Sequence, residues 1–234
     1  MAVRNVLAGM GVLEDRNPSV KTTYLGTFGP SGSGAFVNTP TNAALTLGTT
    51  SNFTIEWWMY STAYSYNGWL GCPVCFLSAG VGPLRLDTAW TSLIASVSFA
   101  TRPAPPLNVW THFAASRSNG TGYVHINGVQ YASAANATNF DMSNSRIGNY
   151  NNGPSQEWCG YLSQFRISTN ARYPIGVNFT PRVLLTSDIN TLFLTLNSAS
   201  FVDTGPYNLG SLTVTPGSNI PTMISSTISR TVVG

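Results

Sequence analysis

The sequence carries few of the groups that acid–base catalysis requires. It has eight acidic residues among 234. Hydrolysis of a glycosidic bond needs two carboxyl groups about 5–10 Å apart, and only Glu14 and Asp15 are neighbours in the sequence. Adjacent residues on a strand point to opposite faces, so these two do not make such a pair. The other acids are scattered, at Glu56, Asp87, Asp141, Glu157, Asp188 and Asp203.

The two histidines and three cysteines do not complete a reactive site or a metal site. A triad built on His112 or His125 would be expected with a nucleophile elbow, which the sequence lacks. Cys72-Pro-Val-Cys75 has the spacing of a metal or redox pair, but zinc needs four ligands, and Cys159 stands alone. We therefore predict no enzymatic activity and no cofactor. The histidines are interpreted as polar or semi-buried strand residues.

Calcium is bound by six to eight oxygens, usually with several carboxylates. The wide spacing of the aspartates argues against a strong calcium site. A weak site made of backbone and asparagine carbonyls stays open.

Two segments combine aromatic rings with amides, as a carbohydrate site would. Rings can stack on sugars, and amides can bond sugar hydroxyls. The alternative is that both segments cover sheet edges or pack against neighbouring subunits, which suits a chain this rich in Asn and Tyr. The segments are 64–69 and 149–158, and the candidate glycan or partner contacts are Tyr64, Tyr66, Trp69, Asn149, Tyr150, Asn152 and Trp158.

The composition indicates a neutral all-β protein. Charged residues make up only 8% of the chain, whereas 43% is hydrophobic and 12% aromatic. Thr, Ser and Asn number 27, 26 and 21, about a third of the chain. These residues compete with the helical backbone through their side chains, and Thr and aromatics suit strands. A disordered chain would show more charge and fewer aromatics.

Nucleic acid and membrane partners are not expected. The ten arginines are scattered, and nucleic acids require a concentrated basic surface. No apolar stretch approaches the ~18 residues that span a bilayer. The apolar run at 6–13 leads directly into Glu14-Asp15-Arg16 without a cleavage pattern. We interpret the chain as made in the cytoplasm and assembled without export.

Strict alternation of apolar and polar residues predicts the strands that would position any site. In segment 53–60, Phe53, Ile55, Trp57 and Met59 fall on one face, which we expect to be the core face. Tight turns at Asn119-Gly120 and Asn127-Gly128 indicate a meander. Arg166 is expected to face solvent or to bond a nearby loop. Further strands are expected at 75–78, 84–87, 93–99, 109–116, 123–126, 145–148, 160–168 and 192–196, which together favour a β-sandwich or jelly roll.

The two ends of the chain lack this alternation. We predict an N-terminal arm over 1–34, a sandwich over 35–204 and a C-terminal tail over 205–234. Apolar residues in the arm are expected to be buried only on an assembly partner, and its removal should leave the body folded. These assembly residues are Val6, Leu7, Leu13, Tyr24 and Phe28.

The order of motifs resembles the concanavalin A-like superfamily, specifically the laminin-G-like modules common in bacteriophage structural proteins. The resemblance covers roughly residues 33–198. The motifs that carry it are 35–37, 53–58, 108–114 followed by 123–128, and 160–168. The resemblance implies a jelly-roll sandwich of two antiparallel sheets. Hydrolases of that superfamily carry carboxylates two or four residues apart on one strand, a pattern absent here.

The resemblance also implies two candidate functions. The first is a bacteriophage virion structural protein, most simply a capsid cement or decoration subunit that contacts the major capsid or other virion proteins. By analogy it would be a homo-oligomer, a trimer at a lattice axis. The alternative is a tail-fibre or lectin-like adhesin that binds host cell-surface glycan.

Overall fold

The computed structural model describes residues 21–29, 34–63, 74–75, 106–149, 158–215 and 218–228. These residues form strands and one short 3₁₀ turn, η1 (Ala43–Leu45), and no described helix has the length and apolar character to cross a membrane. The strands are β1 (Lys21–Phe28), β2 (Phe36–Asn38), β3 (Thr46–Gly48), β4 (Phe53–Ser61), β5 (Val74–Cys75), β6 (Trp110–Ser118), β7 (Thr121–Ile126), β8 (Val129–Ala135), β9 (Phe140–Asp141), β10 (Arg146–Ile147), β11 (Gly160–Ser168), β12 (Thr191–Thr195), β13 (Thr213–Thr215) and β14 (Thr222–Ile228).

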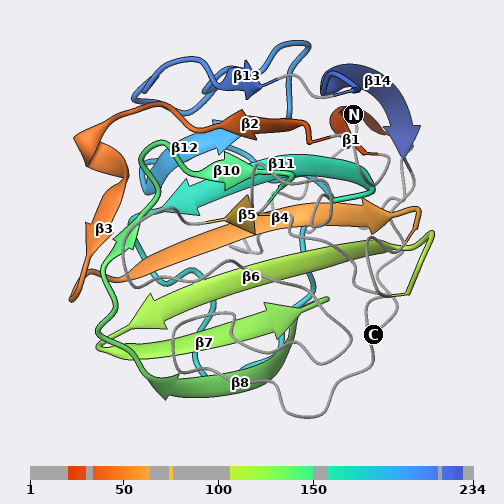
Figure 1. Cartoon of the computed structure of the whole chain (residues 1–234). Coiled ribbons are helices and arrows are strands. Elements are labelled where there is room, and N and C mark those ends of the chain that lie inside the picture. The colour runs from red at the N-terminus through yellow and green to blue at the C-terminus, as the bar shows by residue number, and fades with distance from the viewer. Residues whose placement is uncertain are drawn as a thin grey trace, which may run out of the picture.

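The strands make two layers of antiparallel sheet (Figure 1). The large sheet has the order β14-β1-β11-β4-β6-β7-β8, and β12 also pairs with β11. The smaller sheet has the order β13-β2-β10-β5, and β3 and β9 form a separate two-stranded ribbon. The all-β sandwich predicted from the sequence is confirmed. The predicted strands at 84–87 and 93–99, and residues 76–78 of another, lie outside the described residues.

The core lies between the sheets and contains the residues that the alternation in β4 assigned to it. Phe53, Ile55, Trp57 and Met59 are each at most 1% exposed. The Trp57 ring lies 4.5 Å from that of Phe113 on the neighbouring strand β6, measured between centroids. Val37 and Ile147 close the core from the smaller sheet, where they are paired.

The two expected asparagine–glycine turns join β6 to β7 and β7 to β8. Asn127 and Gly128 both have positive φ, of 48° and 80°, which short hairpin turns of this kind require. Gly128 has a second reason to lack a side chain. A Cβ there would lie 1.7 Å from the Phe179 carbonyl oxygen, because the segment after β11 crosses the sheet at this turn.

The structure corrects the expected arm and tail. Residues 21–28 are β1, which pairs with β11 on one side and with β14 on the other. Phe28 is 6% exposed and packs in the core of this chain, so it is not available to an assembly partner. Tyr24 lies partly exposed on the same strand. Glycines at 26 and 29 interrupt the alternation in this segment. Val6, Leu7 and Leu13 lie outside the described residues.

The tail likewise contributes strands. β13 pairs with β2, and β14 pairs with β1 along seven successive residues. β1 and β14 are therefore paired although their partner residues lie 195 to 207 positions apart in sequence. The sandwich extends beyond both predicted boundaries of 35–204.

A long connection between β11 and β12 covers the outer face of the large sheet. We call residues 169–190 the strap. It has no regular strand, yet it is bonded to several strands beneath it: Tyr123 donates to the Tyr173 carbonyl at 2.6 Å, and the Trp58 indole donates to the Arg182 carbonyl at 3.1 Å. Trp58 is 1% exposed as a result.

Phe28→Ala should lower the free energy of unfolding by about 3–5 kcal/mol, as expected for a large ring removed from a packed core. Urea unfolding monitored by fluorescence measures the loss. Tyr24→Ala, on the same strand but partly exposed, should have a clearly smaller effect. Equally small losses in both variants would mean that residues 21–28 do not hold the body together.

Candidate functional site

The outer faces of three neighbouring strands bring a carboxylate, an imidazole and a guanidinium together. Glu56 lies in β4, directly paired with Arg166 of β11, and Trp58 of β4 pairs with His112 of β6. Alternation points all of these side chains away from the core. Glu56 and His112 are 0% exposed and Arg166 is 4% exposed. The strap supplies the remaining walls of this buried polar cluster.

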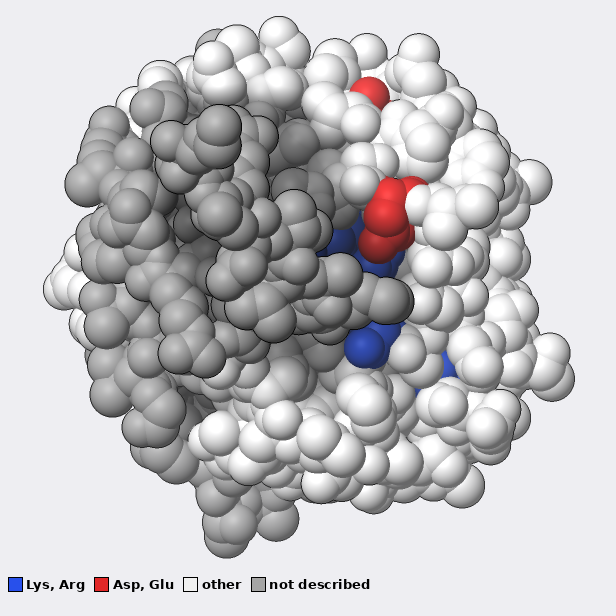
Figure 2. All heavy atoms as spheres, turned by 180° about the vertical axis from the view of Figure 1, so that it is seen from behind, with Lys and Arg blue, Asp and Glu red and all other residues white. Residues whose placement is uncertain are grey.

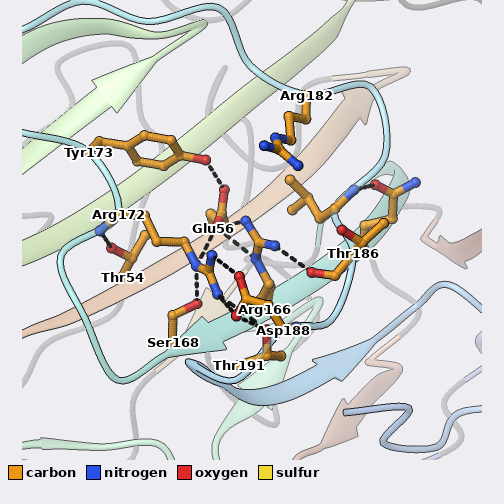
Figure 3. A network of polar contacts seen from close by, with 12 residues as sticks. Thr54, Glu56, Arg166, Ser168, Arg172, Tyr173, Arg182, Thr186, Asp188 and Thr191 are labelled. Atoms are coloured by element: carbon orange, nitrogen blue, oxygen red, sulfur yellow. Dashed lines mark hydrogen bonds and ion pairs between the residues drawn. The ribbon is translucent and has the colours of Figure 1, made fainter. Parts of the chain in front are cut away.

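Both oxygens of Glu56 are occupied (Figure 3). Arg166 donates to Oε1 from Nη2 at 2.6 Å and from Nε at 2.9 Å. On Oε2, the Tyr173 hydroxyl donates at 2.5 Å and His112 Nε2 at 3.2 Å. Figure 3 shows Tyr173 of the strap approaching Glu56 from one side, and Arg166 and Arg172 approaching it from the other.

These partners keep Glu56 ionised. Burial alone would raise the pKa of this carboxyl, but the hydrogen bond from His112 and the charge of Arg166 outweigh burial and hold the pKa at about 2. The same contacts act on Tyr173 in the opposite sense. Burial and the neighbouring Glu56 charge raise the pKa of the Tyr173 phenol well above its ordinary range.

A second ion pair, between Arg172 and Asp188, joins the two ends of the strap. Arg172 donates to both carboxylate oxygens of Asp188 at 2.6 Å and to Ser168 of β11 at 2.5 Å. The hydrogen bonds from Arg172 hold the pKa of Asp188 well below its usual range. Arg172 Nε also lies 3.9 Å from Glu56 Oε1, so one guanidinium bridges the two carboxylates.

This bridged pair does not match the chemistry of glycoside hydrolysis. That reaction requires one carboxylic acid that keeps its proton until it donates it to the leaving group. Glu56 and Asp188 both have lowered pKa values and both are bonded to arginine. The arrangement is suited to holding the strap on the sheet, which is a structural role.

Both histidines lie beneath the strap, as buried strand residues. The rings of Tyr173 and Phe179 stack in parallel with centroids 3.6 Å apart and meet His112 and His125 edge-on. His125 Nε2 lies 3.2 Å from the Val177 carbonyl. Burial lowers the pKa of His125 to about 4, against a smaller opposing effect of that hydrogen bond. His125 is therefore neutral at pH 7.

The predicted glycan contacts fall into two groups. Tyr64, Tyr66, Trp69, Tyr150 and Asn152 lie outside the described residues. Asn149 and Trp158 are 0% exposed, and Trp158 belongs to the core cluster. These two do not offer a surface to a sugar, because the chain at both positions folds inward to pack against the sandwich.

The structure does bring together the residues that precede one predicted binding segment and those that follow the other. Ser61, at the end of β4, pairs with Gly160, at the start of β11. Beyond this pair, the Thr62 amide donates to the Cys159 carbonyl at 2.9 Å. Residues 61–62 and 159–160, which flank the two segments, therefore lie together at one end of the large sheet.

Sequence reasoning expected Arg166 to face solvent or to bond a nearby loop. Solvent exposure is wrong, because Arg166 is 4% exposed, but its guanidinium does donate to the Thr186 carbonyl of the strap at 2.6 Å. The pairing of Arg166 with Glu56, which was treated as an isolated acid, was not expected. The only available signal was that they lie on polar faces of strongly alternating strands. Cys159 is buried. Among the described residues, no cluster of His, Cys, Asp or Glu has the composition of a metal site.

Removing one partner of the buried ion pair should strongly destabilise the protein. Glu56→Gln or Arg166→Met alone should lower the free energy of unfolding by about 3–5 kcal/mol, because each leaves a buried charge unpaired. The double variant Glu56→Gln/Arg166→Met should lose less than the sum of the two. A double-mutant cycle in urea measures this coupling, and strictly additive losses would contradict the pairing.

The stability of the fold should fall in acid in two stages. The pKa of His125 drops from about 6.5 when unfolded to about 4 when folded, so protonation favours the unfolded chain as the pH falls through this range. The lowered pKa of Glu56 extends the loss from about pH 4.3 down to about 2. Urea unfolding at pH 7, 5 and 3 measures both stages. His125→Gln should flatten the change between pH 7 and 5, and an unchanged profile in that variant would refute the assignment.

Comparison with known proteins agrees with the sandwich. A family model described as the concanavalin A-like lectin/glucanases superfamily matches residues 31–175. No curated protein matched the chain. A candidate carbohydrate binding protein from Bacteroides ovatus has a similar structure, with a TM-score of 0.62 and 15% identity over 91% of this chain. The match covers 62% of that protein, so the chain spans less than two thirds of its length.

Two other structures are more distant. A heptameric SAP-like pentraxin from Limulus polyphemus gives a TM-score of 0.44 at 14% identity, covering 89% of this chain and 95% of its own. Domain 4 of an arabinanase from Geobacillus stearothermophilus, solved with arabinotriose, gives 0.35 at 18% identity, covering 64% of this chain and 82% of its own. Because the family match spans more than half of the residues and the observed fold agrees with it, the chain belongs to the concanavalin A-like lectin/glucanases superfamily.

Proposed function

We propose that the chain is a non-enzymatic, lectin-like binding protein at the surface of a bacteriophage virion, where it binds host cell-surface carbohydrate. The observation that carries the non-enzymatic part is the state of Glu56. This fully buried carboxylate has both oxygens bonded and its pKa held at about 2. A carboxylate with both oxygens bonded stabilises the fold, and the function is carried by residues on the surface.

Several features favour carbohydrate as the ligand. The superfamily includes lectins, and the sequence holds two segments rich in aromatic rings and amides, 64–69 and 149–158. In the view from behind, the described part of the surface carries few charged side chains, most of them in one cluster (Figure 2). A neutral surface suits a ligand that presents hydroxyl groups and little charge.

The phage assignment rests on the resemblance of the sequence to modules of phage structural proteins. In this role the chain is made in the host cytoplasm and enters the virion without secretion. We further propose that it acts as a homo-oligomer, with a trimer as the simplest form, and that it contacts other virion proteins.

A second candidate function is capsid decoration, in which the sandwich acts as a cement subunit on the major capsid protein. The observation that favours it is the outer surface of the strap, where Ile175, Val177 and Ile189 are 47%, 50% and 87% exposed. Exposed apolar groups of this size are typical of contact surfaces when they lie together. The pairing of residues 21–28 and 222–228 within the sheet weakens the version of this hypothesis that relied on free arms.

The purified chain should bind bacterial surface polysaccharides in a glycan array without releasing reducing ends from them. The expected turnover is zero, because no carboxyl of the described cluster carries a proton at neutral pH. Release of reducing sugars that Glu56→Gln or Glu157→Gln abolishes would contradict the non-enzymatic assignment. Cryo-EM of the virion separates the two roles: density repeated over the shell lattice supports decoration, and density confined to the tail supports adhesion.

A further inference from the structure

The large sheet has two edge strands, β8 and β14 (Figure 1), and the strap covers part of the first. The Gln130 amide of β8 donates to Asn178 Oδ1 at 3.2 Å, and Gln130 Oε1 accepts from the Gly176 amide at 2.6 Å. β14 pairs with β1 along seven residues, and no other described strand pairs with it. We call the side of β14 that faces away from β1 the open edge.

The sequence of β14 has none of the features that usually keep edge strands apart. Natural edge strands are protected by charged residues, proline, bulges or short length. Residues 222–228 include no charged residue, proline or glycine, and their register with β1 is unbroken. The edge strands of the smaller sheet, β13 and β5, have only three and two residues. An uncharged edge as long as β14 is a template for a further strand.

Hydrogen bonds at the start of β14 indicate which backbone groups face the open edge. The Thr222 amide donates to Thr27 Oγ1 at 3.2 Å, and the Thr222 carbonyl accepts from the same hydroxyl at 3.2 Å. Both backbone groups of Thr222 therefore point toward β1. Because the bonding direction alternates from residue to residue along a strand, the N–H and C=O groups of Met223 and Ser225 point to the open edge.

The outer side chains of β14 are symmetric about Ile224. Met223 packs against the core, so its neighbours Thr222 and Ile224 lie on the opposite, outer face, together with Ser226. Ile224 is 38% exposed, and a hydroxyl-bearing residue stands two positions away on each side of it. If β14 met its own copy about a two-fold axis at Ile224, isoleucine would face isoleucine, and Thr222 would face Ser226. Such matched pairs stabilise neighbouring strands.

The backbone groups fit the same two-fold register. On the core side of the sheet, Met223 of one copy would face Ser225 of the other, and these are the residues whose N–H and C=O groups point to the open edge. Each such pair can exchange both hydrogen bonds. The two Ile224 residues would then form the intervening pair without hydrogen bonds, where opposed side chains lie closest.

We propose that β14 pairs antiparallel with β14 of a second copy of this chain, about a two-fold axis at Ile224, and so joins two large sheets into one. A two-fold contact places residues of one short set opposite each other, so any charge in the strand would face or adjoin a like charge. β14 carries none. The symmetry of the pattern favours a second copy over an unrelated strand, which would not require it.

The pairing names a surface for the homo-oligomer and rests on that part of the proposed function. Because the contact is two-fold, it predicts an even number of copies, and a trimer would need a different surface. The axis is perpendicular to the joined sheet, so the straps of both copies lie on the same side of it.

Sedimentation velocity of the full chain over a range of concentrations tests the proposal. The unchanged chain should form an oligomer with an even number of copies. Ile224→Lys should raise the dimer dissociation constant about tenfold or more, because two like charges then lie directly opposite each other. Ile224→Glu should do the same. An equimolar mixture of the two variants should associate again, because opposite charges then face each other.

Matched variants separate the contact from the fold. Ser225→Pro removes an N–H group that faces the open edge and none that bonds β1, so this variant should stay folded in thermal melts but should not associate. Ile189→Lys adds a charge at a strap residue that is 87% exposed, outside β14, and should leave association unchanged.

The outcomes distinguish the pairing from the wider proposal. If the chain associates and the folded β14 variants associate equally well, or if the mixture of charged variants fails to associate, pairing at Ile224 is refuted and the homo-oligomer stands. Association into three copies only has the same meaning. A chain that is monomeric at every concentration refutes both, whereas carbohydrate binding is measured separately and does not depend on this result.

Discussion

A carboxylate buried beneath the strap is the constraint on which the outer half of this molecule depends. An ionised Glu56 without partners would be very unfavourable in an apolar environment, and the sheet supplies only Arg166 and His112 for it. The third partner, Tyr173, comes from the strap. The strap has no regular strand of its own, so it is positioned largely by these polar contacts, by the Arg172–Asp188 pair and by the stacking of Tyr173 on Phe179. The contacts that stabilise the buried charge of Glu56 therefore also fix the position of the strap.

The cover that satisfies Glu56 also decides which parts of the sheet can meet a ligand. A catalytic pair of carboxylates on the outer face of the large sheet would need that face accessible. Here the strap closes it at the positions of Thr54, Glu56 and Trp58, all at most 1% exposed. One position further along, Tyr60 is partly exposed. The element that satisfies Glu56 thus also covers the neighbouring positions of the sheet.

Local patterns in the sequence were enough to predict the core and the hairpins, because these depend on alternation within one strand and on two-residue turns. The core face of β4 and the turn at Asn127-Gly128 followed in this way. Pairing between distant segments left no comparable signal. β1 and β14 meet across almost the whole chain length, and Gly26 weakens the alternation of β1, so both ends were interpreted as free arms. An arginine on a strand likewise suggests solvent exposure when the distant groups that would bond it cannot be read from the sequence. Arg117 is 0% exposed and donates to the carbonyls of Ser51, Thr138 and Gly48 at 2.7–2.8 Å, none of which the sequence pattern reveals.

The site was only partly predictable, and its physical basis explains why. Composition directed attention to aromatic and amide side chains, and it selected them by their density in loops. The buried polar cluster has no such density: Glu56, His112 and Arg166 lie far apart in the sequence and are brought together by strand register. Register is set by strand pairing across the sheet, so a cluster of this kind exists only once the fold has formed. Trp158, chosen from an aromatic loop, lies in the core, whereas Trp110, which the sequence places at the start of a hairpin strand, stands partly exposed between the strap and the sheet end.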